Sequence, residues 1–289
     1  MRINTNLKNF RKRHLKKNNQ IIYYTESLKN KRIIENLIEN FLIDNNSFIF
    51  ESVEKGKIRG RYTIFGKNPD KIWEFKNNKV YLFNKQTKKI INKSPYIFLK
   101  KMVEEFKFQT PKNLPPICSL LAGFFSYDII RYIEKIPNNC VDDLNLPDVR
   151  ILRPTSLIIH DNVKKKIFYI VNCYYDERIS DYQSKLKKIK QTLVSLKECT
   201  KYNIGNSLKI YPKQNKIKKI KSNLSKKYFK NMILKAKNYI KKGDIFQVVL
   251  SQRFETNLTK HPLEIYKKLR VTNPSPFMYF FNFDDFQII

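Results

Sequence analysis

The sequence predicts an α+β fold in which mainly antiparallel sheets pack against helices. Strand-like and helix-like segments are mixed along the chain without the regular alternation that marks a parallel α/β sheet. Two pairs of strand-like segments are joined by short polar turns, as in antiparallel hairpins. Hydrophobic residues make up 42% of the 289 residues, which is enough to bury a substantial core.

The first half of the chain predicts a basic arm, two helices and several strands. Residues 1–20 are polar and basic, and we expect a loose arm there. Apolar pairs recur at helical spacing from Ile33 to Leu42, which predicts an amphipathic helix. Ser94 and Pro95 begin a second helix, with serine as the N-cap and proline in the first turn. The strand-like runs between these helices cover 48–54, 61–65, 72–75 and 79–84, the last two joined by the turn Lys76-Asn77-Asn78.

The middle of the chain predicts a hairpin and a long helix. Residues 117–127 fit a strand that leads into a short helix, and residues 149–160 and 166–173 fit a hairpin. Apolar residues from Ile179 to Leu196 step by three and four positions, which predicts the long helix. Residues 199–224 contain glycine, proline and many lysines, so we expect a basic linker there.

Beyond this linker the sequence predicts a helix, a strand and another helix. Ser225 caps the first helix, whose apolar face we expect to be buried, and Gly243 ends it. Pro262 opens the second helix. Between them the residues alternate, which predicts a strand with Phe246, Val248, Leu250 and Phe254 on one face and Gln247, Ser251 and Arg253 on the other. Such a strand suits a sheet that lines a polar cavity.

Four blocks of sequence carry a family resemblance. The blocks are Phe48-Ile49-Phe50-Glu51-Ser52-Val53-Glu54 with Gly60-Arg61-Tyr62, Ala122-Gly123-Phe124-Phe125-Ser126-Tyr127-Asp128, the segment from Gly243 to Phe254, and Asn273-Pro274-Ser275-Pro276-Phe277-Met278. In this order they resemble anthranilate synthase component I, a family of chorismate-utilising enzymes. The resemblance extends from about Tyr23 to the last residue and implies the α+β fold of that family.

The resemblance implies a domain organisation and an activity. Residues 21–198 would form the family's N-terminal regulatory domain, and 225–289 would begin its chorismate-binding catalytic domain. The family converts chorismate and ammonia to anthranilate and pyruvate, the first step of tryptophan biosynthesis. A glutamine amidotransferase subunit, component II, supplies the ammonia, and Mg²⁺ is the cofactor. The family's catalytic residues and Mg²⁺ ligands lie in its later half, so we assign none of them in this chain and expect the chain alone to be inactive.

The resemblance also implies a site for L-tryptophan, the feedback inhibitor. The matching residues are Ser52, Pro276, Phe277 and Met278, with Glu51 and Asn273 as neighbouring candidates. A hydroxyl can bond one polar end of an amino acid, while proline, aromatic and thioether groups can enclose an indole. Phe277 stands where the family usually has tyrosine, and Ile49-Phe50 replaces Leu-Leu. Without the resemblance, Ser52 would be an ordinary strand serine and Met278 an ordinary core residue. Gln247 and Ser251 are candidates for lining the chorismate cavity, although packing within the sheet is an alternative.

Other chemistry-bearing residues give no further site. His14, His160 and His261 are isolated, and the pairs Asp142/Asp143 and Asp284/Asp285 are adjacent, so their side chains diverge. We interpret these residues as structural or loop residues and expect no metal site. Cysteines 118, 140, 173 and 199 are scattered without zinc or disulfide spacing, which favours reduced thiols and a cytoplasmic location. No apolar run reaches the ~18 residues of a membrane helix, so we expect no membrane partner.

The net charge of +33 is spread over the whole chain. Lysine occurs beside abundant asparagine and isoleucine, a pattern typical of an AT-rich genome. The charge would attract anionic substrates such as a dicarboxylate, but it specifies no partner. A nucleic-acid-binding protein is an alternative, and it would require basic and aromatic residues gathered on one face.

Further alternatives concern the enzyme and the extent of the chain. Aminodeoxychorismate synthase component I shares the fold but usually departs from the Asn-Pro-Ser-Pro block. A non-catalytic regulatory fragment is another alternative. The sequence stops at Phe286-Gln287-Ile288-Ile289, inside an apolar strand pattern. We therefore expect that the C-terminal part of the fold is missing, through either a natural truncation or a partial record.

Overall fold

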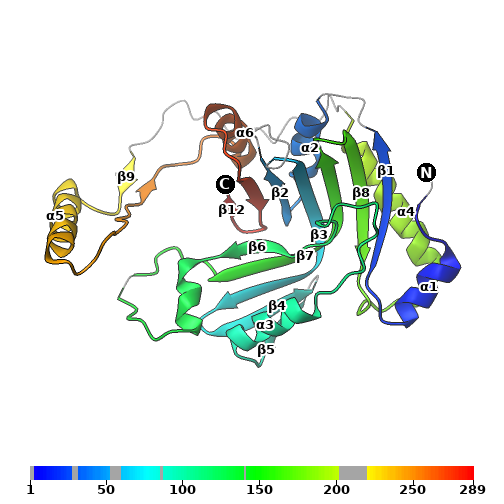
Figure 1. The fold of residues 1–289 in the computed structure, drawn as a ribbon, viewed down its shortest axis with the longest axis horizontal. Coiled ribbons are helices and arrows are strands. Elements are labelled where there is room, and N and C mark those ends of the chain that lie inside the picture. The colour runs from blue at the N-terminus through cyan, green and yellow to red at the C-terminus, as the bar shows by residue number, and fades with distance from the viewer. Residues whose placement is uncertain (1–2, 28–31, 53–59, 85–86, 140, 202–219) are drawn as a thin grey trace. The chain divides into compact units, whose positions relative to one another are not determined.

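The computed structural model describes residues 3–27, 32–52, 60–84, 87–139, 141–201 and 220–289. It confirms the α+β fold, because ten strands of the described residues form one antiparallel sheet with helices packed against it (Figure 1). The described chain divides into two compact units. The first runs up to Lys201 and also contains 266–289, and the second contains 220–265.

The large sheet belongs to the first unit. Its main path runs β1–β8–β7–β3–β2–β11–β12, while β4 pairs with β3 and β5, and β6 pairs with β7. The strands are β1 (Gln20–Ser27), β2 (Ser47–Glu51), β3 (Tyr62–Lys76), β4 (Lys79–Asn84), β5 (Thr87–Ile91), β6 (Ala122–Phe125), β7 (Val149–Asp161), β8 (Lys166–Cys173), β11 (Met278–Asn282) and β12 (Gln287–Ile288). The predicted hairpins are confirmed as β3–β4 and β7–β8.

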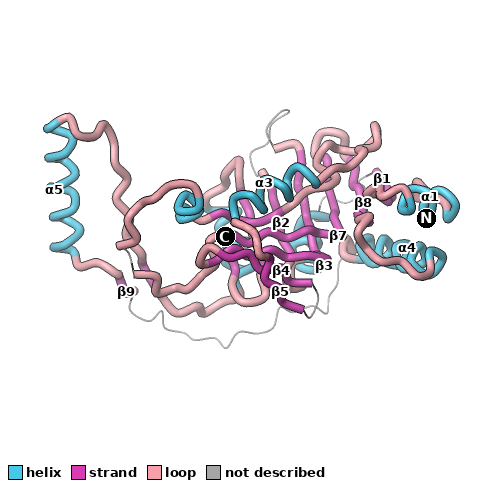
Figure 2. Tube along the Cα trace, turned by 90° about the horizontal axis from the view of Figure 1, so that it is seen from below, coloured by secondary structure: helices cyan, strands magenta, loops and turns pink. Residues whose placement is uncertain are grey.

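Helices cover the sheet of the first unit. They are α1 (Leu7–Leu15), α2 (Ile33–Phe41), α3 (Pro95–Glu105), the 3₁₀ helix η1 (Tyr127–Tyr132), α4 (Tyr182–Glu198) and the part of α6 (Pro262–Thr272) from Tyr266 onward. Figure 2 shows α1 and α4 side by side, and α4 contacts β8 and β1. The apolar stripe of α4 buries Leu186, Ile189, Leu193 and Leu196, as its spacing predicts.

The expected loose arm is wrong for residues 7–15, which form α1. Asn6 caps this helix by accepting a hydrogen bond from the backbone N–H of Asn9 at 2.9 Å. Phe10 is fully buried, and its ring lies 6.0 Å from that of Tyr182 in α4. The composition is basic, but one aromatic residue on the inner face is enough to dock the short helix.

β3 is one strand of 15 residues, where the sequence predicts two short ones. Gly66 and Pro69 interrupt the strand-like pattern and caused the error. The register against β7 shifts between Pro69 and Lys71, so the proline lies where the ladder is irregular. A missing backbone N–H is tolerated at such a position.

Two hydrophobic clusters of described residues pack on the sheet. The larger one contains Phe48, Leu157, Phe168, Phe281 and Phe283, with buried residues from seven other positions around them. The smaller one lies under α3 and contains Trp73, Phe75, Val80, Met102, Val149 and Ile151. Because β11 contributes Phe281 to the larger cluster, residues 266–289 pack with the first unit rather than with the residues just before them.

The second unit contains β9 (Lys221–Ser222), α5 (Lys226–Lys242), β10 (Phe254–Glu255) and the start of α6. The predicted ends of α5 are confirmed. The Ser225 side chain accepts a hydrogen bond from the Tyr228 N–H, and Gly243 ends the helix in the left-handed conformation with φ of 80°. The expected burial of its apolar face is wrong within the described residues, because Ala236 is its one buried residue and Tyr228 is 57% exposed.

The strand predicted for 246–254 is also wrong over most of its length. Of this segment only Phe254, together with Glu255, enters a ladder among the described residues, and its partner there is β9. Phe246 is fully exposed. Alternation predicts which faces a strand would have, but a strand forms only where a neighbour accepts its backbone hydrogen bonds.

Candidate functional site

A pocket of about 870 Å³ lies where β2 ends beside β11. Its wall is formed by Phe50, Glu51, Ser52, Gly60, Arg61, Tyr62, Ile64, Pro116, Ile117, Pro276, Phe277, Met278 and Tyr279. Most of this wall is apolar, and a few polar groups stand at its edge. That combination is typical of a site for a small amphipathic molecule.

Antiparallel pairing brings the two predicted segments of the site together. Met278 lies opposite Glu51, and Tyr279 lies opposite Phe50. The two strands are far apart in the sequence, yet their ends form one corner. Ser52 follows directly after β2, and Pro276 and Phe277 come directly before β11, so all three reach the same pocket.

The Ser52 hydroxyl is buried and unsatisfied within the described part of the chain. Its Oγ has no hydrogen-bond partner there. A buried hydroxyl without a partner carries a desolvation cost of about 1–3 kcal/mol, so such groups usually have a reason. A polar ligand in the pocket would supply the missing partner.

Arg61 belongs to the pocket wall and forms an ion pair with Asp161. Its Nε and Nη2 donate to Oδ2 of Asp161 at 3.2 and 2.9 Å, and the guanidinium lies 4.8 Å from the centre of the Tyr62 ring. Burial alone would raise the pKa of Asp161, but hydrogen bonds from Arg61 and from the N–H groups of Lys164 and Val163 outweigh it and lower that pKa. The hydrogen bonds to Asp161 use Nε and Nη2 of Arg61 and not Nη1.

The other predicted site residues lie in different places. Phe277 is 81% exposed at the rim. Asn273 is exposed and is not part of the pocket wall. Gln247 and Ser251 are exposed in the second unit, outside any strand. Their assignment to a second cavity stays a prediction.

The sequence did not predict eight residues of the wall, which are Phe50, Gly60, Arg61, Tyr62, Ile64, Pro116, Ile117 and Tyr279. Arg61 and Tyr62 belong to a block that was noted for its resemblance, but no role was assigned to them. A cation followed by an aromatic residue at the start of a strand was the available signal. Pro116 and Ile117 lie in a proline-rich segment between α3 and β6, and only the fold of that loop brings them to the pocket.

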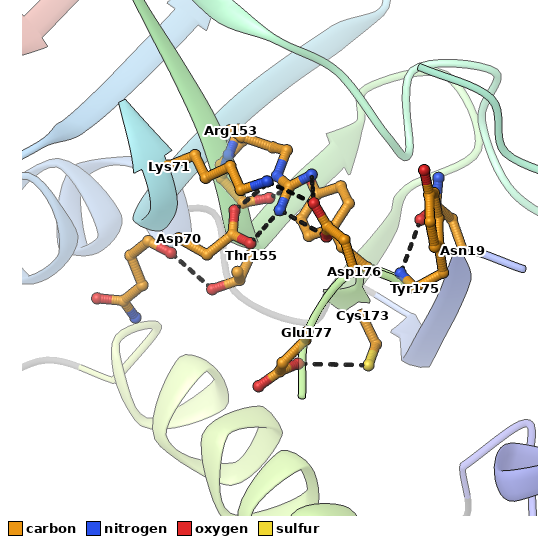
Figure 3. A network of polar contacts seen from close by, with 12 residues as sticks. Asn19, Asp70, Lys71, Arg153, Thr155, Cys173, Tyr175, Asp176 and Glu177 are labelled. Atoms are coloured by element: carbon orange, nitrogen blue, oxygen red, sulfur yellow. Dashed lines mark hydrogen bonds and ion pairs between the residues drawn. The ribbon is translucent and has the colours of Figure 1, made fainter. Parts of the chain in front are cut away.

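A second pocket, of about 280 Å³, lies between α3 and the sheet. Figure 3 shows its polar edge, where Arg153 lies between Asp70 and Asp176. The guanidinium donates to Asp70 at 2.8 Å and to Asp176 at 2.9 Å, and it lies 3.9 Å from the centre of the Tyr174 ring. Lys71 also donates to Asp176 at 2.5 Å. These charges neutralise one another, so the network stabilises the fold rather than forming a free binding group.

The three histidines are structural in different ways. His14 contacts the Tyr182 hydroxyl and the Glu177 carbonyl, each at 3.0 Å. His261 accepts a hydrogen bond from the Leu263 N–H at 3.1 Å at the start of α6. His160 in β7 is 4% exposed, and neither ring nitrogen has a partner among the described residues.

His160 predicts a loss of stability in mild acid. Burial, and secondly the charge of Lys165, lower the pKa of His160 below its usual 6.5. The unfolded chain therefore binds this proton first, and the stabilisation present above pH ~6.5 is lost as the pH falls below it. We expect His160→Phe to reduce the acid-side decrease in unfolding free energy by about 1 kcal/mol, measured by urea denaturation between pH 7.5 and 5.

His14→Gln is the matched control, because it removes a histidine that has hydrogen-bond partners. Parallel pH curves for His160→Phe and the wild type would contradict the prediction.

The described residues hold no metal cluster and no membrane helix. Nowhere among them do three side chains of His, Cys, Asp or Glu gather as a metal would require. The adjacent side chains of Asp284 and Asp285 have different partners. Asn45 donates a hydrogen bond to Asp284, and Arg150 donates one to Asp285. No helix in the described ranges is both long and apolar enough to cross a membrane.

Comparison with known proteins gives consistent matches. Residues 46–289 match the family described as chorismate binding enzyme. The chain is 36% identical to anthranilate synthase component 1 of Acetivibrio thermocellus, over 88% of this chain and 52% of that protein. It is 35% identical to the chloroplastic anthranilate synthase alpha subunit 1 of Oryza sativa subsp. indica, over 80% of this chain and 43% of that protein.

A solved structure shows the same similarity. The crystal structure of anthranilate synthase component I from Streptococcus pneumoniae TIGR4 superposes with a TM-score of 0.65 at 30% identity, covering 82% of this chain and 51% of that one. The chain spans about half the length of the curated relatives that it matches.

Proposed function

This chain belongs to the chorismate-binding enzyme family, and on that premise we propose that it is part of an anthranilate synthase component I. The activity would be the conversion of chorismate and ammonia to anthranilate and pyruvate, with ammonia derived from glutamine by a component II subunit. The relatives at 31–36% identity support this proposal by name. The cytoplasmic location and the domain boundaries at 198 and 225 stay predictions.

The described residues supply no donor set for Mg²⁺. Six oxygen ligands in a near-octahedral arrangement are the usual requirement, and no three carboxylate, His or Cys side chains of the described chain converge. The Mg²⁺ cofactor therefore stays a prediction from the family, with no ligand assigned among the described residues. We assign no catalytic residue to this chain.

We propose that the pocket between β2 and β11 binds L-tryptophan as a feedback inhibitor. The observation that carries this proposal is the convergence of Ser52 with Pro276, Phe277 and Met278 on one pocket. Its apolar wall suits an indole. Two of its polar groups, the Ser52 hydroxyl and the Arg61 guanidinium, suit the charged end of a free amino acid.

The chemistry of the wall assigns a role to each part. Arg61 would bind the carboxylate, since a guanidinium forms strong charge-assisted bonds with that group. Ser52 would share a polar end of the ligand. Phe50 and Tyr62 would enclose the ring with aromatic contacts to it. Phe277 would close the rim by its ring alone, because it lacks the hydroxyl of a tyrosine.

The inhibitor site is tested by removing the Ser52 hydroxyl. We expect Ser52→Ala to weaken L-tryptophan binding about fivefold, because one neutral hydrogen bond contributes about 1 kcal/mol. Arg61→Gln should weaken it further, by about tenfold, because the lost bond is charge-assisted. Isothermal titration calorimetry with L-tryptophan measures both effects.

Ser126→Ala is the matched control for the serine variant. Ser126 Oγ is also buried without a partner among the described residues, but Ser126 is not part of the pocket wall. Its removal should leave the affinity unchanged. If Ser52→Ala binds tryptophan as tightly as the wild type, the site assignment is wrong.

The activity is tested with the complete coding sequence that contains this chain. The protein is incubated with chorismate, ammonium and Mg²⁺, and anthranilate is followed by its fluorescence. We expect anthranilate. Formation of aminodeoxychorismate would instead assign the protein to the related folate-pathway enzyme.

A further inference from the structure

Glu51 ends β2 at the pocket, but its carboxylate is bound by α6. Oε1 accepts hydrogen bonds from the Tyr266 hydroxyl at 2.5 Å and from Nε of Arg270 at 2.8 Å. The Glu51 side chain is 2% exposed. A buried carboxylate with two donors is firmly held, and the two donors come from one helix.

The geometry of the strand places this carboxylate on the α6 face of the sheet. Successive strand residues point to opposite faces, so Glu51 shares a face with Ile49 and not with Phe50. Phe280, which lies opposite Ile49, packs against the Tyr266 ring at 5.7 Å between ring centres. Phe50 points the other way and contributes to the pocket wall.

Glu51 holds both ends of the segment that forms one wall of the pocket. This wall segment, residues 273–278, begins directly after α6 ends at Thr272. Its first end is fixed by the bond between the Glu51 side chain and Arg270, and its last residue, Met278, lies opposite Glu51 in the β2–β11 ladder. Two prolines stiffen the segment between these ends, so a shift of α6 would move the wall as one piece.

We infer that Glu51 is a positioning residue of the tryptophan pocket, which holds α6 through Tyr266 and Arg270 and thereby places the wall segment. The inference rests on the proposed function of this pocket. Because coupling between two sites is reciprocal, tryptophan in the pocket restrains α6 to the same extent that α6 favours tryptophan binding.

The charges around Glu51 support this arrangement. Burial alone would lower the pKa of Arg270, but Glu51 outweighs it and raises that pKa, so the arginine stays charged. Burial and Glu51 together raise the pKa of Tyr266, which keeps its hydroxyl a donor. Arg270 also lies 3.6 Å from Glu35 of α2, which joins α6 to a second element of the first unit.

The test compares variants on the two sides of this contact. Tyr266 and Arg270 are not part of the pocket wall, so neither should matter to a ligand unless it acts through Glu51. We expect Glu51→Gln, Tyr266→Phe and Arg270→Gln each to weaken L-tryptophan binding about tenfold, the scale of one charge-assisted bond. Lys267→Gln removes a positive charge from the same helix, at the pair with Glu39, and should change affinity less than twofold.

Two further measurements separate positioning from a general loss of structure. The double variant Glu51→Gln/Arg270→Gln should have about the same L-tryptophan affinity as the single variant that binds tryptophan less tightly. Both changes break the same contact, so their effects should not add. Tryptophan should slow hydrogen exchange at the amides of 266–272 in the wild type but not in Glu51→Gln. If Arg270→Gln fails to fold, Tyr266→Phe, which keeps the ring packing, completes the comparison.

Each outcome decides the inference. Unchanged affinity in Tyr266→Phe and Arg270→Gln, with weakened binding in Glu51→Gln, would show that Glu51 contacts the ligand directly and would overturn it. A wild-type chain that binds no tryptophan would overturn the proposed function of the pocket, and the inference with it. The two failures are therefore distinguished by the wild-type titration.

Discussion

Replacing Arg153 with methionine is expected to lower the free energy of unfolding by about 3–5 kcal/mol, the usual cost of breaking a buried ion pair on one side. Arg153 is 9% exposed and bonds Asp70 and Asp176 at once. Its removal would leave two carboxylates facing each other in a largely buried site. Their repulsion, added to the lost stacking on Tyr174, makes this one of the most damaging single changes in the chain.

The electrostatics of the site support this magnitude. Burial alone would raise the pKa of Asp176, but hydrogen bonds from Arg153 and Lys71 outweigh it and hold the pKa below its usual value. The carboxylate is therefore ionised in the folded protein. Denaturation in urea at pH 7, followed by circular dichroism, measures the loss.

Two comparisons test the cause of that loss. Lys71→Met removes a more exposed partner of the same Asp176, with the lysine side chain 25% exposed, and should cost about 1 kcal/mol or less. Neutralising Asp70 and Asp176 to asparagine in the Arg153→Met background should recover part of the stability, because no unpaired charge then remains buried. If Arg153→Met costs no more than Lys71→Met, the charge network does not stabilise the fold as described.

Replacing Gly123 with alanine is expected to cost about 3 kcal/mol, because the new methyl group would overlap backbone atoms. A Cβ built on Gly123 lies 2.0 Å from the carbonyl oxygen of Arg150 and 2.8 Å from Cα of Ile151. Both atoms belong to β7, the strand paired with β6. Backbone atoms of a central strand have no alternative rotamer, so β6 must move away from β7.

The displacement of β6 would also expose core residues. Ala122 lies opposite Leu152 in this ladder, and both belong to the larger hydrophobic cluster. Phe125→Ala serves as the control, since this residue is in the same strand but its side chain is 54% exposed. We expect that variant to lose less than about 1 kcal/mol in thermal or urea unfolding. Equal losses for the two variants would contradict the close approach of β6 and β7.

Local sequence signals predicted the ends of α5 and the apolar stripe of α4. Ser225 and Gly243 mark the ends of α5 because a cap acts on backbone groups within one turn. The spacing of Leu186 and Leu193 predicted α4 for the same local reason. The hairpin turn at Asn77 and Asn78 was equally visible, and both residues have positive φ, which asparagine tolerates.

Signals that depend on distant partners were less reliable. The alternation after Gly243 predicted a strand, but only its last residue pairs with β9. Residues 7–15 look too polar to fold, yet burial of Phe10 against α4 orders them. In both cases the deciding contact comes from another part of the chain, and composition does not contain it.

The residues of the candidate pocket also fall into those that the sequence indicates and those that only the structure reveals. The family resemblance singled out Ser52 and residues 276–278, while composition and spacing alone would have left them as ordinary strand residues. Only the structure shows that Arg61, Pro116 and Ile117 belong to the pocket wall. For Glu51 the predicted role and the observed contacts differ most, because its hydrogen bonds to α6 cannot be inferred from the sequence.

The sequence by itself determined the fold class, the ends of α5, the hairpins and the family of this protein. The tertiary structure alone decided that Glu51 meets Met278, that Arg150 bridges Glu74 and Asp285, and which charges are buried. The physical reason is the distance along the sequence over which each kind of interaction acts. Caps, turns and periodicity act over a few neighbouring residues, whereas strand pairing and the energy of a buried charge depend on groups that only the completed fold brings together.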